Sequence, residues 1–291
     1  MGNKDTSFPK IRSIRIGEKL FDFSQPKIMG VLNLTPDSFY DGGKYNQEEY
    51  WVGHTRKMLD EGADIIDLGA VSTRPGAEPV SEVMEMDRLL APLKILLAEF
   101  PEAVFSIDTY HAGIARQCVK TGAHMINDIS GGSFDKKMFV TIADLKVPYV
   151  LMHIHGSPKN MQVHPISENI ENIIYQFFKE KVAVLKLLGV EDIILDPGFG
   201  FGKTLKSNYR LLYKIASTRI DNLPILAGIS RKSMINKVID TTPSEALNGT
   251  TVVNTLALLN GVNLLRVHDV KEAREAIDII HYYRNFVMFS K

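Results

Sequence analysis

Residues 193–203 read Ile-Ile-Leu-Asp-Pro-Gly-Phe-Gly-Phe-Gly-Lys, so three apolar residues run directly into a carboxylate and a glycine-rich turn. An apolar run bounded by turn residues predicts a strand that is buried on both faces. A carboxylate at the end of such a strand is costly unless it has a partner or a ligand, so Asp196 marks a candidate site. The stretch does not match a nucleotide-binding loop, because Pro197 stands where a phosphate loop needs glycine, and the glycine spacing is not that of a dinucleotide site.

The same pattern recurs along the chain. Some predicted strands follow a glycine that suits the end of a helix, and others follow a proline. Amphipathic segments such as residues 82–100, 167–188 and 272–286 lie between them. Strands that alternate with helices predict a parallel sheet. With eight such strands, the chain closes most simply into a (β/α)8 TIM barrel. A doubly wound open sheet is the alternative, but it usually carries a glycine-rich loop after its first strand.

The N-terminal segment follows a different pattern. Residues 11–23 alternate between apolar and polar side chains around Gly17 and Glu18, which predicts a short β-hairpin ahead of the barrel. We therefore divide the chain into residues 1–25, a tail with the hairpin, and residues 26–291, the barrel.

Composition restricts the partners and the compartment. The chain has 291 residues, and its 34 Lys and Arg balance its 34 Asp and Glu, which argues against a general nucleic-acid surface. The single cysteine, Cys118, fits a reducing compartment. No apolar run is long enough to cross a bilayer, and the polar first residues lack a secretory core. We expect a cytoplasmic protein with no nucleic-acid or membrane partner.

Polar residues stand where the predicted strands end, and in a TIM barrel these ends form the active site. They are Asn33, Asp67, Asp108, Asn127, His153, Asp196, the turn of residues 230–233, and Arg266 with His268. Carboxylates and amides together suit a flat heterocycle with an amino-pyrimidinone edge. A cationic arc and Mg²⁺ suit a phosphate-bearing arm of the same ligand.

Several of these motifs resemble those of the dihydropteroate synthases. The segment Leu-Asn-Leu-Thr-Pro-Asp-Ser-Phe at residues 32–39 resembles their first-loop signature, and residues 67–69 and 72–76 resemble the second. Residues 196–203, 230–233 and 266–269 complete the pattern, which runs in order from about Pro26 to the C-terminus. Ala70-Val71 departs from it, because many members carry Gly-Glu there.

The resemblance implies a transferase of folate biosynthesis. Such an enzyme transfers the pterinylmethyl group of 6-hydroxymethyl-7,8-dihydropterin diphosphate to the amine of 4-aminobenzoate, giving 7,8-dihydropteroate and diphosphate. The family's homodimer, formed through the later helices, is expected too. Sulfonamides, which mimic 4-aminobenzoate, are expected to compete with it.

The resemblance also assigns roles to residues. Asp108, Asn127, Asp196 and Lys232 are expected to bind the pterin. Arg266 is expected to stack on the pterin ring and, with His268 and Thr73, to bind the diphosphate arm, while Asn33 helps to place Mg²⁺. Arg74, next to Thr73, is expected among the substrate-binding residues. The second substrate, 4-aminobenzoate, is expected to bind to Phe39, Pro75, Phe201 and the backbone N–H of Ser233. Asp37 is expected to stabilise the cation that forms when diphosphate leaves, so the catalytic residues are Asp37, Asn33, Lys232 and Arg266.

Three other functions stay open at this point. His153 and His155 lie on the same side of an extended segment, a pattern seen in metal-dependent hydrolases. A pterin-dependent methyltransferase would keep the pterin-binding residues but has no reason to keep residues 35–39 or the Lys232-Ser233 pair. A non-catalytic pterin-binding protein would usually lack Asn33 or Asp37, and both are present.

Overall fold

The computed structural model describes residues 11–34, 44–71 and 80–289. Its main sheet has eight parallel strands in the order β8-β7-β6-β5-β4-β3-β10-β9. The strands are β3 (Lys27–Asn33), β4 (Ile65–Gly69), β5 (Phe105–Asp108), β6 (Met125–Asp128), β7 (Tyr149–Met152), β8 (Ile193–Asp196), β9 (Leu226–Ala227) and β10 (Leu264–Val267). The sheet closes beside β8, where Leu195 N–H donates to the carbonyl oxygen of Pro224 at 2.9 Å. The predicted (β/α)8 TIM barrel is confirmed.

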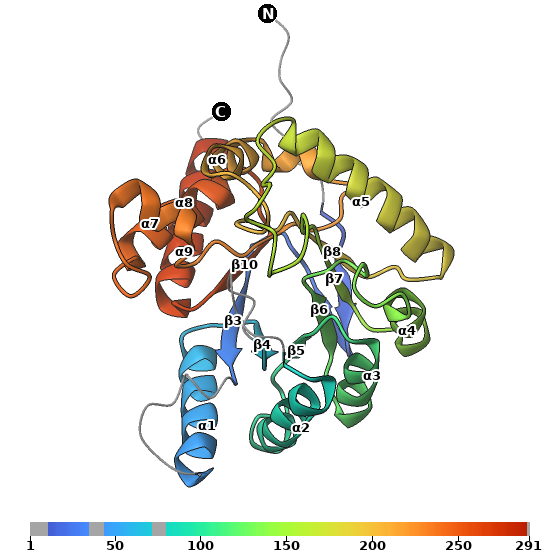
Figure 1. The fold of residues 1–291 in the computed structure, drawn as a ribbon. Helices are drawn as coiled ribbons and strands as arrows, with labels where there is room; N and C mark the ends of the chain where they lie inside the picture. The colour runs from blue at the N-terminus through green and yellow to red at the C-terminus, as the bar shows by residue number, and fades with distance from the viewer. Residues whose placement is uncertain (1–10, 35–43, 72–79, 290–291) are drawn as a thin grey trace, which may run out of the picture.

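Helices surround the strands (Figure 1). They are α1 (Lys44–Asp60), α2 (Glu82–Glu99), α3 (Ala112–Thr121), α4 (Met138–Leu145), α5 (Ile170–Leu187), α6 (Leu205–Lys214) with the 3₁₀ turn η2 (Ile215–Thr218), α7 (Ser233–Ile239), α8 (Leu247–Leu259) and α9 (Val270–Phe289). The predicted helical segments thus form α2, α5 and α9. The glycines expected at helix ends have positive φ, for example Gly62 at 96° and Gly122 at 124°, and a β-carbon is strained in that conformation.

The predicted hairpin is also present. It consists of β1 (Ile14–Ile16) and β2 (Lys19–Phe21), which pair antiparallel. Its buried side chains, Ile14, Ile16 and Phe21, pack with Phe23 into a core to which each barrel strand, or the residue just before it, contributes one side chain. Those eight side chains are Met29, Ile65, Val104, Met125, Val150, Ile194, Leu226 and Leu264. The hairpin therefore seals the N-terminal end of the barrel with apolar surface.

The barrel interior becomes polar two residues further along the strands. Residues i and i+2 of a strand point to the same side. The next interior positions are therefore Val31, Asp67, Ser106, Asn127, Met152, Asp196, Gly228 and Arg266. An apolar layer thus lies beneath a layer that is rich in charged and amide groups, and the polar layer opens at the carboxyl ends of the strands.

No helix in the described part of the chain is long and apolar enough to span a membrane.

Candidate active site

One partly buried guanidinium connects three strands at the mouth of the barrel. Arg266 on β10 donates from Nε to Asp67 Oδ2 at 2.7 Å and from Nη2 to Asp108 Oδ2 at 2.7 Å. Asn127 on β6 donates from Nδ2 to the same oxygen of Asp67 at 2.9 Å. Asp67 is fully buried. Two carboxylates therefore share one cation, and the cluster carries a net negative charge when both are ionised.

The charge imbalance appears in the pKa values of the cluster. Burial raises the pKa of Asp108 to about 7 against the attraction of Arg266, and the neighbouring Asp67 raises it further. Burial alone would lower the pKa of Arg266, but Asp67 and Asp108 raise it above its usual range, so the guanidinium stays charged. Asp67 Oδ1 and Ser106 Oγ have no hydrogen-bond partner within the described residues. The cluster therefore keeps buried polar atoms whose hydrogen-bonding capacity the described residues do not fill.

Asp196 lies at the end of β8, where the chain turns sharply. Its Oδ1 accepts from the Gly198 N–H at 2.7 Å. Burial raises the pKa of Asp196, while Lys232 opposes this most strongly. Gly198 has a φ of 68°, and a β-carbon there would lie 2.0 Å from the carbonyl oxygen of His153. The loop after β8 can pass this close to the His153 carbonyl only with glycine at position 198. This close passage keeps the Asp196 carboxylate at the end of the strand.

Lys203 holds the glycine-rich loop from inside. Its side chain is only 3% exposed, and Nζ donates to the carbonyl oxygens of Gly198 at 2.7 Å, Phe201 at 3.0 Å and His153 at 3.3 Å. Burial lowers the pKa of Lys203 to about 7, against the attraction of Asp196. This lysine therefore binds backbone oxygens and fixes the loop that follows β8, a role that the sequence analysis did not assign to it.

Lys232 reaches across the same loop from the segment before α7. Its Nζ donates to the carbonyl oxygen of Phe199 at 2.6 Å and lies 4.6 Å from the centroid of the Phe201 ring. Burial lowers the pKa of Lys232 to about 8, and Asp196 opposes this. The structure thus brings together Lys232, Asp196 and Phe201, as the sequence analysis expected of one site.

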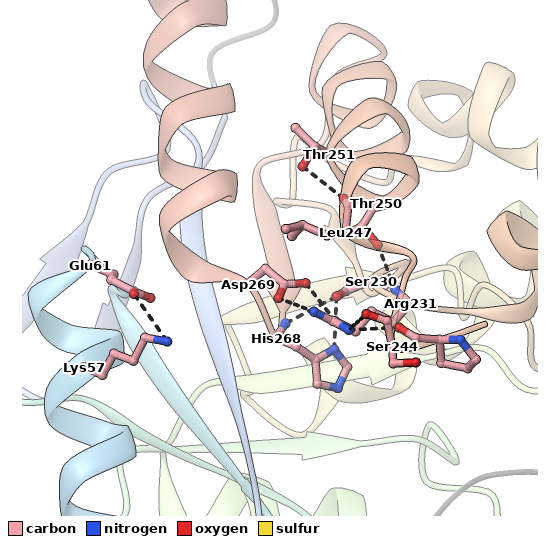
Figure 2. A network of polar contacts seen from close by, with 11 residues as sticks. Lys57, Glu61, Ser230, Arg231, Ser244, Leu247, Thr250, Thr251, His268 and Asp269 are labelled. Atoms are coloured by element: carbon pink, nitrogen blue, oxygen red, sulfur yellow. Dashed lines mark hydrogen bonds and ion pairs between the residues drawn. The ribbon is translucent and has the colours of Figure 1, made fainter. Parts of the chain in front are cut away.

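Two further contacts join the loop after β9 to the loop after β10 (Figure 2). Ser230 Oγ lies 3.0 Å from His268 Nδ1. Beside this contact, Arg231 donates to Asp269 from Nε at 2.9 Å and from Nη2 at 2.7 Å. His268 therefore lies next to the turn that follows β9. Arg231 is committed to the protein itself and does not belong to the cationic arc at the mouth.

The remaining predicted residues divide into two groups. Asn33 is exposed at the end of β3, and a β-carbon on Gly69 would lie 3.9 Å from its Oδ1 and 3.7 Å from Asp108 Oδ2. Ser233 is the first residue of α7, where a helix was expected to begin. The predicted residues Asp37, Phe39, Thr73, Arg74 and Pro75 lie outside the described residues.

His153 directly follows the last residue of β7, but its side chain does not face the barrel mouth as expected. It follows Met152 by one residue, so its side chain points outward from the barrel and packs edge-on against Phe177, with the ring centroids 5.0 Å apart. Burial lowers its pKa to about 2, so the imidazole is neutral. His155, by contrast, is exposed. Among the described residues, no three His, Cys, Asp or Glu side chains are placed to hold a metal ion.

The sequence of this chain matches a known protein family. The family model for pterin binding enzymes matches residues 29–268. Dihydropteroate synthase of Escherichia coli (strain K12) is 41% identical over 261 residues, which cover 89% of this chain and 92% of the E. coli protein. This chain belongs to the dihydropteroate synthases. The expectation of a transferase of folate biosynthesis is thereby confirmed.

Solved dihydropteroate synthases share the fold. The Yersinia pestis enzyme, whose crystal structure is that of a sulfonamide drug complex, has a TM-score of 0.88 at 37% identity and covers 94% of this chain and 100% of its own. The Xanthomonas albilineans enzyme with 4-aminobenzoic acid has a TM-score of 0.87 at 32% identity and covers 94% of this chain and 98% of its own.

In this dihydropteroate synthase, we expect Lys203→Met to lower the free energy of unfolding by about 2–4 kcal/mol. Three carbonyl oxygens would lose their shared donor inside the protein. Urea unfolding followed by circular dichroism measures the change. Lys206→Met is the control, because Lys206 is exposed three residues further along and should change the free energy by less than about 0.5 kcal/mol. Equal stability of the two variants would show that the loop does not depend on Lys203.

Proposed function

We propose that this chain condenses 6-hydroxymethyl-7,8-dihydropterin diphosphate with 4-aminobenzoate, giving 7,8-dihydropteroate and diphosphate. The observation that carries the proposal is the acceptor-rich cluster of Asp67, Asp108, Asn127 and Asp196 beside Arg266 and Lys232 in one barrel mouth. The family relationship supports it, since the relatives reported above are dihydropteroate synthases.

The acceptors suit the hydrogen-bonding edge of a pterin. Asp196 would accept from adjacent N–H groups of the pyrimidinone, while Asn127 can both donate and accept. Lys232 would donate to the ring carbonyl. Asp108 would bind a further ring N–H, and the guanidinium of Arg266, held flat by two carboxylates, would stack on the ring face.

The cationic side of the mouth suits the diphosphate. Arg266 and His268 would contact its oxygens, with Thr73 and Arg74 from the second loop. Asn33 would help to hold Mg²⁺, which prefers oxygen ligands and usually binds through substrate phosphates and few protein groups. Its exposed amide at the end of β3, near Asp108, fits that role. Bound Mg²⁺ would neutralise the diphosphate and so make it a better leaving group.

The second substrate would bind where α7 begins. The backbone N–H of Ser233 would donate to the carboxylate of 4-aminobenzoate, and Phe201, Phe39 and Pro75 would pack against its ring. Sulfonamides would compete for this place. Because an arylamine is largely neutral at pH 7, it needs no general base before it attacks the methylene carbon. Asp37 would stabilise the cation left by diphosphate departure, and water would have to be excluded to prevent its hydrolysis.

An exposed apolar surface supports a homodimer. Val252, Leu256 and Leu259 form an exposed stripe along α8. Ile279 and Tyr282 are exposed on α9, the helix against which α8 packs. Apolar patches of this kind mark interaction sites on soluble proteins. We therefore propose that two copies associate through α8 and α9 and that the enzyme works in the cytoplasm.

The decisive test is chemical. With Mg²⁺ and the pterin diphosphate present, adding 4-aminobenzoate should produce 7,8-dihydropteroate and an equal amount of diphosphate. A pterin-dependent methyltransferase would make no dihydropteroate, and a non-catalytic pterin-binding protein would bind the pterin without releasing diphosphate. Either result would refute the proposed reaction.

We expect Asp196→Asn to weaken pterin binding by about 2–4 kcal/mol, because an amide offers one acceptor where a carboxylate offers two. Calorimetry with the pterin diphosphate measures this. Asp192→Asn, just before the same strand, is the control, since its carboxylate accepts from Arg15 N–H at the opposite end of the barrel. Parental affinity in folded Asp196→Asn would remove Asp196 from the pterin site.

Pterin affinity should also depend on pH through Asp108. With a pKa of about 7, this carboxyl is mostly ionised at pH 8 and mostly protonated at pH 6. Only the ionised form has an acceptor oxygen for the ring N–H as well as one for Arg266, so pterin affinity should fall about tenfold between pH 8 and pH 6. Calorimetry at both values measures the change. Asp108→Asn should bind weakly at both, and an unchanged pH dependence in that variant would assign the titration to another group.

A further inference from the structure

Two loops that carry proposed ligand-binding residues are joined by a bidentate ion pair. Arg231, between β9 and α7, donates to both carboxylate oxygens of Asp269, which lies between β10 and α9. In such a pair two parallel hydrogen bonds fix the orientation as well as the distance of the partners. The neighbouring contact between Ser230 and His268 reinforces the same junction.

Arg231 also makes contacts outside this junction. Besides Asp269, the guanidinium donates from Nη1 to the carbonyl oxygens of Pro243 at 2.9 Å and Ser244 at 3.0 Å. Its backbone N–H donates to Thr250 Oγ1 on α8 at 3.1 Å. Arg231 therefore binds the segment before α8, the helix itself and the loop after β10 (Figure 2).

The backbone at Arg231 is strained in a way that these contacts can maintain. Its φ is 58°, a left-handed conformation that is uncommon for a residue with a side chain. Such a residue persists when its surroundings hold it, and strain of this kind gathers at functional sites. Here the strained residue immediately precedes Lys232 and Ser233 in the chain.

The two ends of the ion pair lie directly beside the groups that face the ligand. Asp269 follows His268, and Arg231 precedes Lys232. Adjacent α-carbons are about 3.8 Å apart, so the position of each partner largely sets that of its neighbour. The ion pair consequently sets the spacing between His268 on one loop and the Lys232-Ser233 pair on the other.

We propose that Arg231 and Asp269 are positioning residues of this enzyme: their ion pair places His268 to bind the diphosphate of the pterin substrate, and Arg231 itself does not contact that diphosphate. The proposal rests on the proposed function, because it assumes a diphosphate-bearing substrate. It gives the arginine next to Lys232 a role distinct from that of Lys232.

The test compares two ligands that differ only in the diphosphate. Affinities for 6-hydroxymethyl-7,8-dihydropterin diphosphate, with Mg²⁺, and for 6-hydroxymethyl-7,8-dihydropterin are measured by calorimetry. The proteins are the parent enzyme, Arg231→Lys, Asp269→Asn and a control. Arg210→Lys is the matched control, because Arg210 makes a bidentate pair with Glu171 on the outer helices, from Nε at 2.9 Å and Nη2 at 2.5 Å. Thermal melting verifies that each variant is folded.

The ratio of the two affinities is the decisive quantity. It is insensitive to the fraction of folded protein and to any shift of Lys232 that affects both pterins alike. We expect the preference for the diphosphate ligand to fall about tenfold in both Arg231→Lys and Asp269→Asn and to stay at the parental value in Arg210→Lys.

Asp269→Asn separates positioning from direct binding. If Arg231 were itself a diphosphate ligand, removing the charge of Asp269 would release it and strengthen diphosphate binding. A stronger preference in Asp269→Asn, or a parental ratio in either folded variant, would overturn the proposal. A parent enzyme that forms no dihydropteroate would instead refute the proposed reaction, while the ratio of affinities is measured without turnover.

Discussion

The guanidinium of Arg266 is the interaction on which the barrel mouth depends. It binds Asp67, 199 positions away in the chain, and Asp108 on the strand after that of Asp67. These ion pairs form only when β10 pairs with β3 in the sheet. Burying three charges costs solvation energy, and a buried ion pair is weak evidence for stability. The apolar layer beneath, covered by the hairpin, supplies the stability that lets the mouth remain polar.

The cations around the mouth divide into two kinds. Lys203 donates its hydrogen bonds to backbone carbonyls, and Arg231 donates to backbone carbonyls and to Asp269. Both residues thereby hold the loops in place. Lys232 also donates to a backbone carbonyl, that of Phe199, but it and Arg266 lie close to Asp196 and Asp108, where a ligand would bind. Arg231 and Lys232 are adjacent in the chain, yet one holds the framework and the other belongs to the site. Such division of labour lets a loop carry function without losing its shape.

Much of the fold could be predicted because its signals are local. Apolar runs ending in polar residues predict buried parallel strands, and Gly62 and Gly122 mark helix ends where φ must be positive. Asp108, Asn127, Asp196 and Arg266 were expected at one rim, since parallel strands end on the same side. The expectation that the His153 side chain faces the mouth failed because successive residues of a strand point to opposite sides. A shift of one position therefore turns a side chain from the barrel interior to the helices outside.

The sequence by itself determined the eight-strand repeat, the hairpin and the chemistry available at the strand ends, because these follow from apolar periodicity, turn residues and the types of polar side chain. Only the tertiary structure decided which polar groups meet. It pairs Arg266 with two carboxylates, turns Lys203 inward onto three carbonyl oxygens and commits Arg231 to Asp269. The reason is physical: the type of a charged residue does not reveal its partners. Its role depends on which groups the closed barrel brings within about 3 Å of it.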